Sequence, residues 1–382
     1  MYKVVDHFHE SVRQASLKTL GQFVEVLNII KPPQRPWITG MLSNENPLDG
    51  YVRETLKNII PIFSQIIRDD NDEFCVIEAC NSLSKMVKDV GPVVVEDWLD
   101  KLLEALFAVL TKDSACQLER EEFEDDDKDL DLMNSSFGAI STICQAYGHK
   151  SKQIFEKALP LMLKYYDKSQ PSTLRALSIG TIGEMVNALE GESANVVGRL
   201  IPLALQAMND PHSTLRQNAC YACGIFCRWG PNQAKSFIPQ VLQSYLRVIN
   251  DKVPTISDNV CGSLARLILA FGPQIPLVDL LKAMFSSVPM KEDLEPYTPF
   301  FQSIELLLTQ KAELVSPHLQ SITLTLAHAV ENQDGLEEAA KTSASSIFKL
   351  LTQHAKEHFL KAISNLTQEQ QSYIQKLANY SK

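Results

Sequence analysis

Three cysteines in one short segment have the residue type and spacing that could bind a metal ion. Cys220, Cys223 and Cys227 lie three and four residues apart, and cysteine thiolates are common zinc ligands. In a helix this spacing places all three thiols on one apolar face, and no second Cys or His pair follows at zinc-finger spacing. We therefore predict no metal site and reduced core cysteines, and we interpret Cys75 and Cys80 in the same way.

No motif gathers side chains for catalysis. His7 and His9 stand alone near the start of the chain. The sequence contains no His-Glu-x-x-His helix, no Gly-x-x-x-x-Gly-Lys loop and no Gly-x-Ser-x-Gly elbow. We expect no active site and no cofactor, so the chain is predicted not to be an enzyme.

One segment concentrates the acidic residues. Nine acids and two bases lie between positions 119 and 131, so this segment carries −7 of the net charge of −10. We predict an acidic loop at 117–131, between the two helices of one repeat, that attracts a Lys/Arg-rich partner. A solvated insertion with no partner is the alternative. The acids are Glu119, Glu121, Glu122, Glu124, Asp125, Asp126, Asp127, Asp129 and Asp131.

A polar and aromatic stripe follows the helix predicted for 213–229. At 100° per residue, Asn218, Tyr221 and Trp229 fall opposite the apolar face. Asn259 takes the position of Asn218 one repeat later, with Asp258 beside it. An exposed amide can hold the backbone of an extended peptide, and aromatic rings are common binding anchors. The alternatives are inter-repeat packing for Trp229 and plain solvation for the two Asn residues. Earlier repeats place Glu184, Glu78 and Asn81 on this stripe.

A repeated frame positions these residues. Glycine breakers that end successive helices are 57, 43, 39 and 42 residues apart, and the longest interval contains the acidic loop. A period near 40 with two helices per unit is typical of an all-α HEAT-repeat solenoid. The frame consists of an apolar residue followed by Arg, with a Gly eight residues after the Arg. It occurs three times: Val12-Arg13 with Gly21, Leu174-Arg175 with Gly183, and Leu215-Arg216 with Gly224.

The predicted fold is a right-handed superhelix of antiparallel helix pairs, a single solenoid of about eight repeats over 1–382. The chain opens with one helix at about 9–30, which we interpret as the second half of a pair in a longer solenoid. A Pro-rich loop follows at 31–50, and further helices close the chain to about 380. Helix pairs are expected at 51–90, 93–148, 151–190, 194–229, 233–272, 275–311 and 315–353.

Composition limits the partners. Of the 382 residues, 45% are hydrophobic and 21% are charged, so disorder of the whole chain is excluded. A net charge of −10 disfavours direct binding to nucleic acid or to an anionic membrane. No apolar run of eighteen residues and no signal pattern is found, so we expect a soluble, intracellular protein.

Two consecutive runs carry a family resemblance. Residues 210–224 (DPHSTLRQNACYACG) and 257–268 (SDNVCGSLARLI) resemble HEAT repeats of importin-β (karyopherin-β) nuclear transport receptors. The acidic loop and the run LTQEQQ at 366–371 add to the likeness. The resemblance covers nearly the whole chain, as the C-terminal part of such a receptor.

The resemblance implies a nuclear import receptor that moves between cytoplasm and nucleus and holds a basic cargo segment on its concave surface. It assigns the cargo backbone to Asn218 and Asn259, and the aliphatic stems of Lys and Arg to Trp229 and Tyr221. It also implies that Asp258, Glu184 and Glu78 form ion pairs with the Lys and Arg side chains of the cargo. The implied cargo is a histone tail or a ribosomal protein, with a histone chaperone as a further candidate partner. The GTPase Ran is expected to bind mainly through N-terminal repeats that this chain lacks.

A different kind of function stays open. A structural HEAT scaffold that binds a folded partner would explain the repeats, although not the acidic loop or the polar and aromatic stripe. Binding to a folded partner would resist salt, whereas a basic segment held by carboxylates would be released as salt rises.

Overall fold

The computed structural model describes residues 4–118 and 126–380, and those residues contain helices and loops but no strand. The chain divides into two compact units, Met1–Ser193 (unit 1) and Ala194–Lys382 (unit 2). The prediction of an all-α HEAT fold is confirmed. A single continuous solenoid over 1–382 stays a prediction. None of the described helices combines the length and the apolar character that a membrane span needs.

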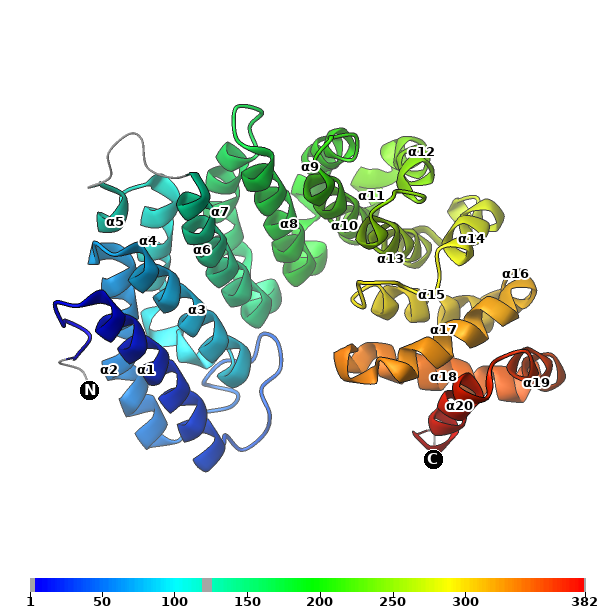
Figure 1. Cartoon of the computed structure of the whole chain (residues 1–382), viewed down its shortest axis with the longest axis horizontal. Coiled ribbons are helices and arrows are strands. Elements are labelled where there is room, and N and C mark those ends of the chain that lie inside the picture. Colours follow the sequence, from blue (N-terminus) through cyan, green and yellow to red (C-terminus); the bar gives the residue numbers. More distant parts are fainter. Residues whose placement is uncertain (1–3, 119–125, 381–382) are drawn as a thin grey trace. The chain divides into compact units, whose positions relative to one another are not determined.

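Unit 1 is a stack of helix pairs in which second helices pack on second helices (Figure 1). The second helix of each pair contacts the next, in the order α1, α3, α6 and α8, while α2, α4 and α7 form the other layer. The bounds are α1 (Glu10–Ile30), α2 (Gly50–Asp69), α3 (Glu73–Val90), α4 (Leu99–Thr111), α5 (Ala115–Leu118), α6 (Asp126–Tyr147), α7 (Lys152–Tyr165) and α8 (Ser172–Leu189).

Unit 2 repeats this arrangement. Its second helices contact one another in the order α10, α13, α15 and α18, and α20 packs on α17 and α18. The bounds are α9 (Ala194–Ala207), α10 (Ser213–Trp229), α11 (Pro231–Ala234), α12 (Ile238–Val248), α13 (Pro254–Phe271), α14 (Leu277–Ser286), α15 (Tyr297–Gln310), α16 (Ala312–Val315), α17 (Leu319–Glu331), α18 (Glu338–His354), α19 (Lys356–Ser364) and α20 (Gln368–Tyr380).

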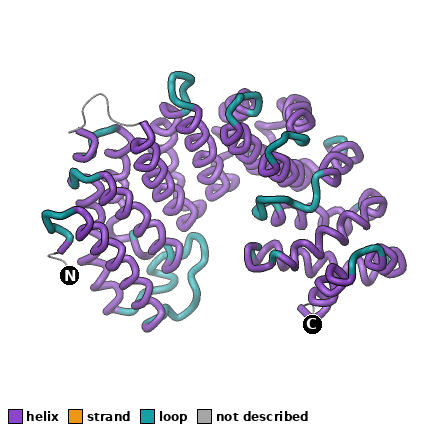
Figure 2. Tube along the Cα trace, in the orientation of Figure 1, coloured by secondary structure: helices purple, strands orange, loops and turns teal. Residues whose placement is uncertain are grey.

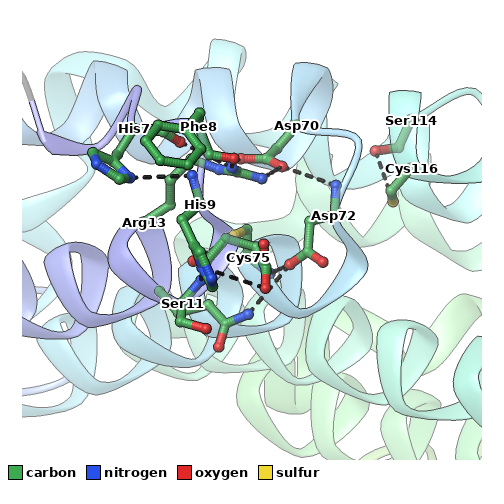
Figure 3. Close-up of polar contacts among 12 residues, drawn as sticks. His7, Phe8, His9, Ser11, Arg13, Asp70, Asp72, Cys75, Ser114 and Cys116 are labelled. Carbon is green, nitrogen blue, oxygen red and sulfur yellow. Dashed lines mark hydrogen bonds and ion pairs between the residues drawn. The ribbon is translucent and has the colours of Figure 1, made fainter.

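The arginine of the repeated frame joins neighbouring repeats. Arg13 of α1 donates through Nε and NH2 to the carboxylate of Asp70, both at 2.8 Å, at the turn before α3 (Figure 3). Asp70 also accepts from the backbone N–H of Asp72, whose side chain caps α3. Arg216 pairs with Asp251 at the corresponding place in unit 2, where its Nε and NH2 lie 3.0 and 2.8 Å from the same oxygen, Oδ2. In two of its three occurrences the frame's arginine thus braces neighbouring repeats.

The Pro-rich segment lies against the ends of two second helices. No α-helix is found at 31–49. The backbone N–H of Gly40 donates to the carbonyl of Ala146 at 2.7 Å, and Lys150 Nζ donates to the carbonyl of Gly40 at 2.7 Å. At the end of α3, Gly91 has φ +97°, and a Cβ placed there would lie 2.7 Å from Trp37. This segment is therefore a packed part of unit 1.

Candidate functional site

The predicted site residues belong to one side of each unit. We call the side formed by the second helices the second-helix face, made by α1, α3, α6 and α8 in unit 1 and by α10, α13, α15 and α18 in unit 2. Glu78 and Asn81 lie on α3 and Glu184 on α8. Asn218, Tyr221 and Trp229 lie on α10, and Asp258 and Asn259 on α13.

On α3, a carboxylate and an amide are one helical turn apart. Glu78 is half-buried and accepts a hydrogen bond from Ser82 Oγ at 2.8 Å, and Asn81 is exposed. Lys85, one turn further on, forms ion pairs with Glu25 of α1 and, at 2.9 Å, with Asp89. A carboxylate and an amide side by side can hold a cationic side chain and the backbone next to it.

On α8, Glu184 is linked to the neighbouring second helix. Its half-buried carboxylate accepts a hydrogen bond from Gln145 Nε2 of α6 at 2.9 Å. Gln145 was not among the predicted site residues. It precedes Glu184 by 39 residues, close to the repeat period, so aligning α6 with α8 could have found it.

On α10, the two aromatic rings already contact cations of unit 2. The guanidinium of Arg266 lies 5.0 Å from the centre of the Tyr221 ring, and that of Arg228 lies 5.2 Å from the Trp229 ring. Both rings are half-buried, as is Asn218. The role predicted for these three residues in holding a partner stays a prediction, but an arginine lies over each ring.

The solvent-facing position predicted for Asp258 and Asn259 is wrong. Asp258 is 0% exposed, and its carboxylate accepts the backbone N–H groups of Lys291, Glu292 and Asp293 at 2.9 to 3.1 Å. Asn259 is 3% exposed, and its Nδ2 donates to Asp293 Oδ2 and to the carbonyl of Thr255, both at 2.9 Å. The loop between α14 and α15 covers both side chains, so neither meets a partner while this loop is in place.

The acidic loop lies largely outside the described residues, which exclude 119–125 and therefore Glu119, Glu121, Glu122, Glu124 and Asp125. The predicted loop is too long at its end, because α6 begins at Asp126 and includes Asp127, Asp129 and Asp131. Asp131 is exposed. The interpretation of the segment as a partner-attracting loop stays a prediction.

The cysteines match the predicted core role. All eight are free and buried, including Cys220, Cys223 and Cys227 on α10. Burial raises the pKa of Cys80 and of Cys144 to about 12, so these thiols stay protonated at neutral pH. Among the described residues, no group of three or more His, Cys, Asp or Glu side chains could hold a metal ion.

Known proteins resemble this chain along most of its length. The HEAT-repeat family model matches residues 200–230. Importin-4 of Mus musculus is 27% identical over 78% of this chain and 27% of that protein, and Importin-4 of Homo sapiens is 26% identical over 100% of this chain and 35% of that protein. The chain thus spans between about a quarter and a third of these relatives.

Solved structures share the fold. Kap121p bound to the SUMO protease Ulp1p superimposes with a TM-score of 0.76 at 15% identity, over 98% of this chain and 34% of that one. Kap121p bound to RanGTP gives a TM-score of 0.75 at 17% identity, over 98% of this chain and 34% of that one. These likenesses support the HEAT-repeat architecture independently of the sequence matches.

Proposed function

Because the chain belongs to the importin-β family, we propose that it binds a basic, extended cargo segment on the second-helix face of unit 1. The observation that carries this proposal is the pair of half-buried carboxylates on that face: Glu184 on α8, which an amide side chain contacts, and Glu78 on α3, with an amide side chain three residues further along the helix. The amides are Asn81 and Gln145.

The binding mechanism is reversible and contains no covalent step, in keeping with a family of non-enzymatic transport receptors. Lysine and arginine side chains of the cargo pair with Glu78 and Glu184, since charge-assisted hydrogen bonds are stronger than neutral ones. The amides of Asn81 and Gln145 hold the cargo backbone. Acids at 119–131 raise the rate of encounter with a basic segment.

The cargo proposed is a histone N-terminal tail, with ribosomal proteins as a second source of basic segments. Two assignments from the sequence change: Asp258 and Asn259 are removed from the cargo site because the α14–α15 loop covers them. Asn218, Tyr221 and Trp229 of unit 2 are left out of the proposed cargo site, because an arginine already lies over the Tyr221 ring and another over the Trp229 ring. Within its receptor the chain would move between cytoplasm and nucleus.

The proposal is tested by fluorescence anisotropy with a labelled histone tail peptide at low and at higher salt. We expect a Kd in the nanomolar to micromolar range, about −8 to −12 kcal/mol, that weakens as salt rises. Combining Glu78→Gln with Glu184→Gln should weaken binding about 10-fold or more.

The matched control is Glu54→Gln, which removes an exposed charge from α2 in the other layer of unit 1. It changes the net charge without touching the second-helix face, so the Kd should stay the same. If the double variant binds as tightly as the unaltered chain, the assigned face is wrong. Binding that is absent or insensitive to salt favours a scaffold for a folded partner.

A further inference from the structure

The loop between α14 and α15 occupies the second-helix face of α13. Figure 2 shows this connection as a long loop in unit 2. Met290 and Tyr297 at its ends are fully buried, whereas Lys291 and Glu292 are exposed. The loop is therefore anchored at both ends, and its middle lies between α13 and solvent.

The loop is held as a turn that wraps around one carboxylate of α13. Asp258 accepts three consecutive backbone N–H groups, those of residues 291 to 293, and Asn259 donates to the carboxylate of Asp293. Two residues further on, Glu295 pairs with Arg266. Backbone groups and alternate side chains are thus bound in order along the loop.

Two side chains of α13 bind carboxylates of the loop. Asn259 and Arg266, at 3% and 4% exposure, receive the carboxylates of Asp293 and Glu295, two of the loop's three. Arg266 is also fixed in direction by the Tyr221 ring beneath its guanidinium. A ligand with acids two residues apart fits these positions, whereas a lysine or arginine in the place of Glu295 would meet a buried cation.

The fit of the loop is incomplete. Arg266 NH1 and Glu295 Oε2 are buried and find no hydrogen-bond partner among the described residues. Each buried polar atom left without a partner costs free energy. A ligand carboxylate that met both terminal nitrogens of Arg266 would remove this cost, since the guanidinium fork matches a carboxylate bidentately.

We propose that the second-helix face of α13 is a binding site for a short acidic peptide with the pattern Asp/Glu-x-Asp/Glu that turns around Asp258, occupied in the free chain by the chain's own α14–α15 loop. A partner with this pattern displaces the loop and takes over Asp258, Asn259 and Arg266. The site is distinct from the basic-segment face of unit 1 and has the opposite charge preference.

Because the chain's own loop occupies the site, the apparent affinity for an added acidic peptide is lowered. A tethered segment competes at an effective concentration that reaches the millimolar range for short links, so an isolated acidic peptide binds the unaltered chain weakly. Six residues, 291–296, separate the buried ends. At about 3.3–3.6 Å per extended residue, these six residues reach about 20 Å when fully extended.

The experiment uses the full chain and a labelled peptide with the loop sequence MKEDLEP (residues 290–296), followed by anisotropy. Combining Asp293→Asn with Glu295→Gln removes the two loop carboxylates that α13 holds and should raise the affinity for the peptide about 10-fold or more. Adding Arg266→Gln, or the charge-keeping Arg266→Lys, should abolish or reduce that gain. A control peptide with Gln and Asn in place of its acids should not bind.

Displacement itself is read by hydrogen exchange. The backbone N–H groups of residues 291–293 are bonded to Asp258, so they should exchange slowly in the free chain and faster at saturating peptide. Either of two results overturns the proposal: unchanged affinity in the D293N/E295Q chain, or protected loop N–H groups at saturation. Binding of the basic histone peptide should be the same in every variant, which separates this test from that of the proposed function.

Discussion

At the scale of single residues, buried ion pairs between repeats are the contacts most sensitive to substitution. Arg13 and Asp70 have side chains that are only 15% and 5% exposed. Asp70→Asn leaves the guanidinium without a counter-charge and should lower the free energy of unfolding by about 3 kcal/mol. Urea denaturation measures this loss. Glu54→Gln, which breaks the exposed pair with Lys57, should leave stability unchanged.

The buried thiols make stability depend on pH in the alkaline range. Burial raises the pKa of Cys80 from 9.0 to about 12. Above pH 9 the unfolded chain loses this proton before the folded chain does, so stability falls as pH rises from 9 towards 12, by about 1.4 kcal/mol per pH unit for each such thiol. Urea unfolding at pH 8 and pH 10 should show a smaller loss in Cys80→Ala. An equal loss in both proteins would contradict this assignment.

The exposure of a side chain was predictable from the sequence where it depends only on the helix that carries the residue. The 100° rotation per residue predicted that Glu78, Asn81 and Glu184 face away from the core, and their side chains are half-buried or exposed. Their role in binding stays a prediction. The same rule failed for Asp258 and Asn259, because a loop more than thirty residues later in the chain covers them. Helical periodicity contains no information about a loop that returns to a helix from the next repeat.

At the scale of elements, the segment 31–49 is fixed by close contacts at the ends of second helices. Gly91 has φ +97°, and a Cβ there would meet Trp37 at 2.7 Å. Gly91→Ala should therefore destabilise unit 1 by about 1–3 kcal/mol, seen as a lower Tm. Gly191→Ala is the matched control, since no atom lies within 4 Å of its added Cβ. An equal Tm for the two variants would show that the segment 31–49 moves away from the added Cβ without loss of stability.

Helices and their order were more predictable than the loops. Every predicted helix pair has a counterpart in the structure, and glycine breakers marked the ends of the first five, because those repeats have their own end signals. The packed course of 31–49 was not predictable, since proline content indicates only the absence of helix. The start of α6 at Asp126, inside the predicted acidic loop, was also missed, as charge density alone does not prevent a helix.

At the scale of the whole molecule, the two units differ in the charges of their second-helix faces. Unit 1 presents Glu78 and Glu184, half-buried and beside amides. In unit 2 the face of α13 is covered by a loop, and Arg228 and Arg266 lie over the aromatic rings of α10. We therefore expect basic segments to bind unit 1, and acidic segments to compete with the α14–α15 loop for the face of α13 in unit 2.

The most direct test is to locate a bound basic peptide on the full chain. A histone tail peptide with a photoreactive group would be cross-linked to the protein, and the sites mapped by mass spectrometry. We predict cross-links on α3, α6 and α8, suppressed by Glu78→Gln with Glu184→Gln. Cross-links confined to α2, α4 and α7, or to unit 2, would contradict the assignment of the cargo site.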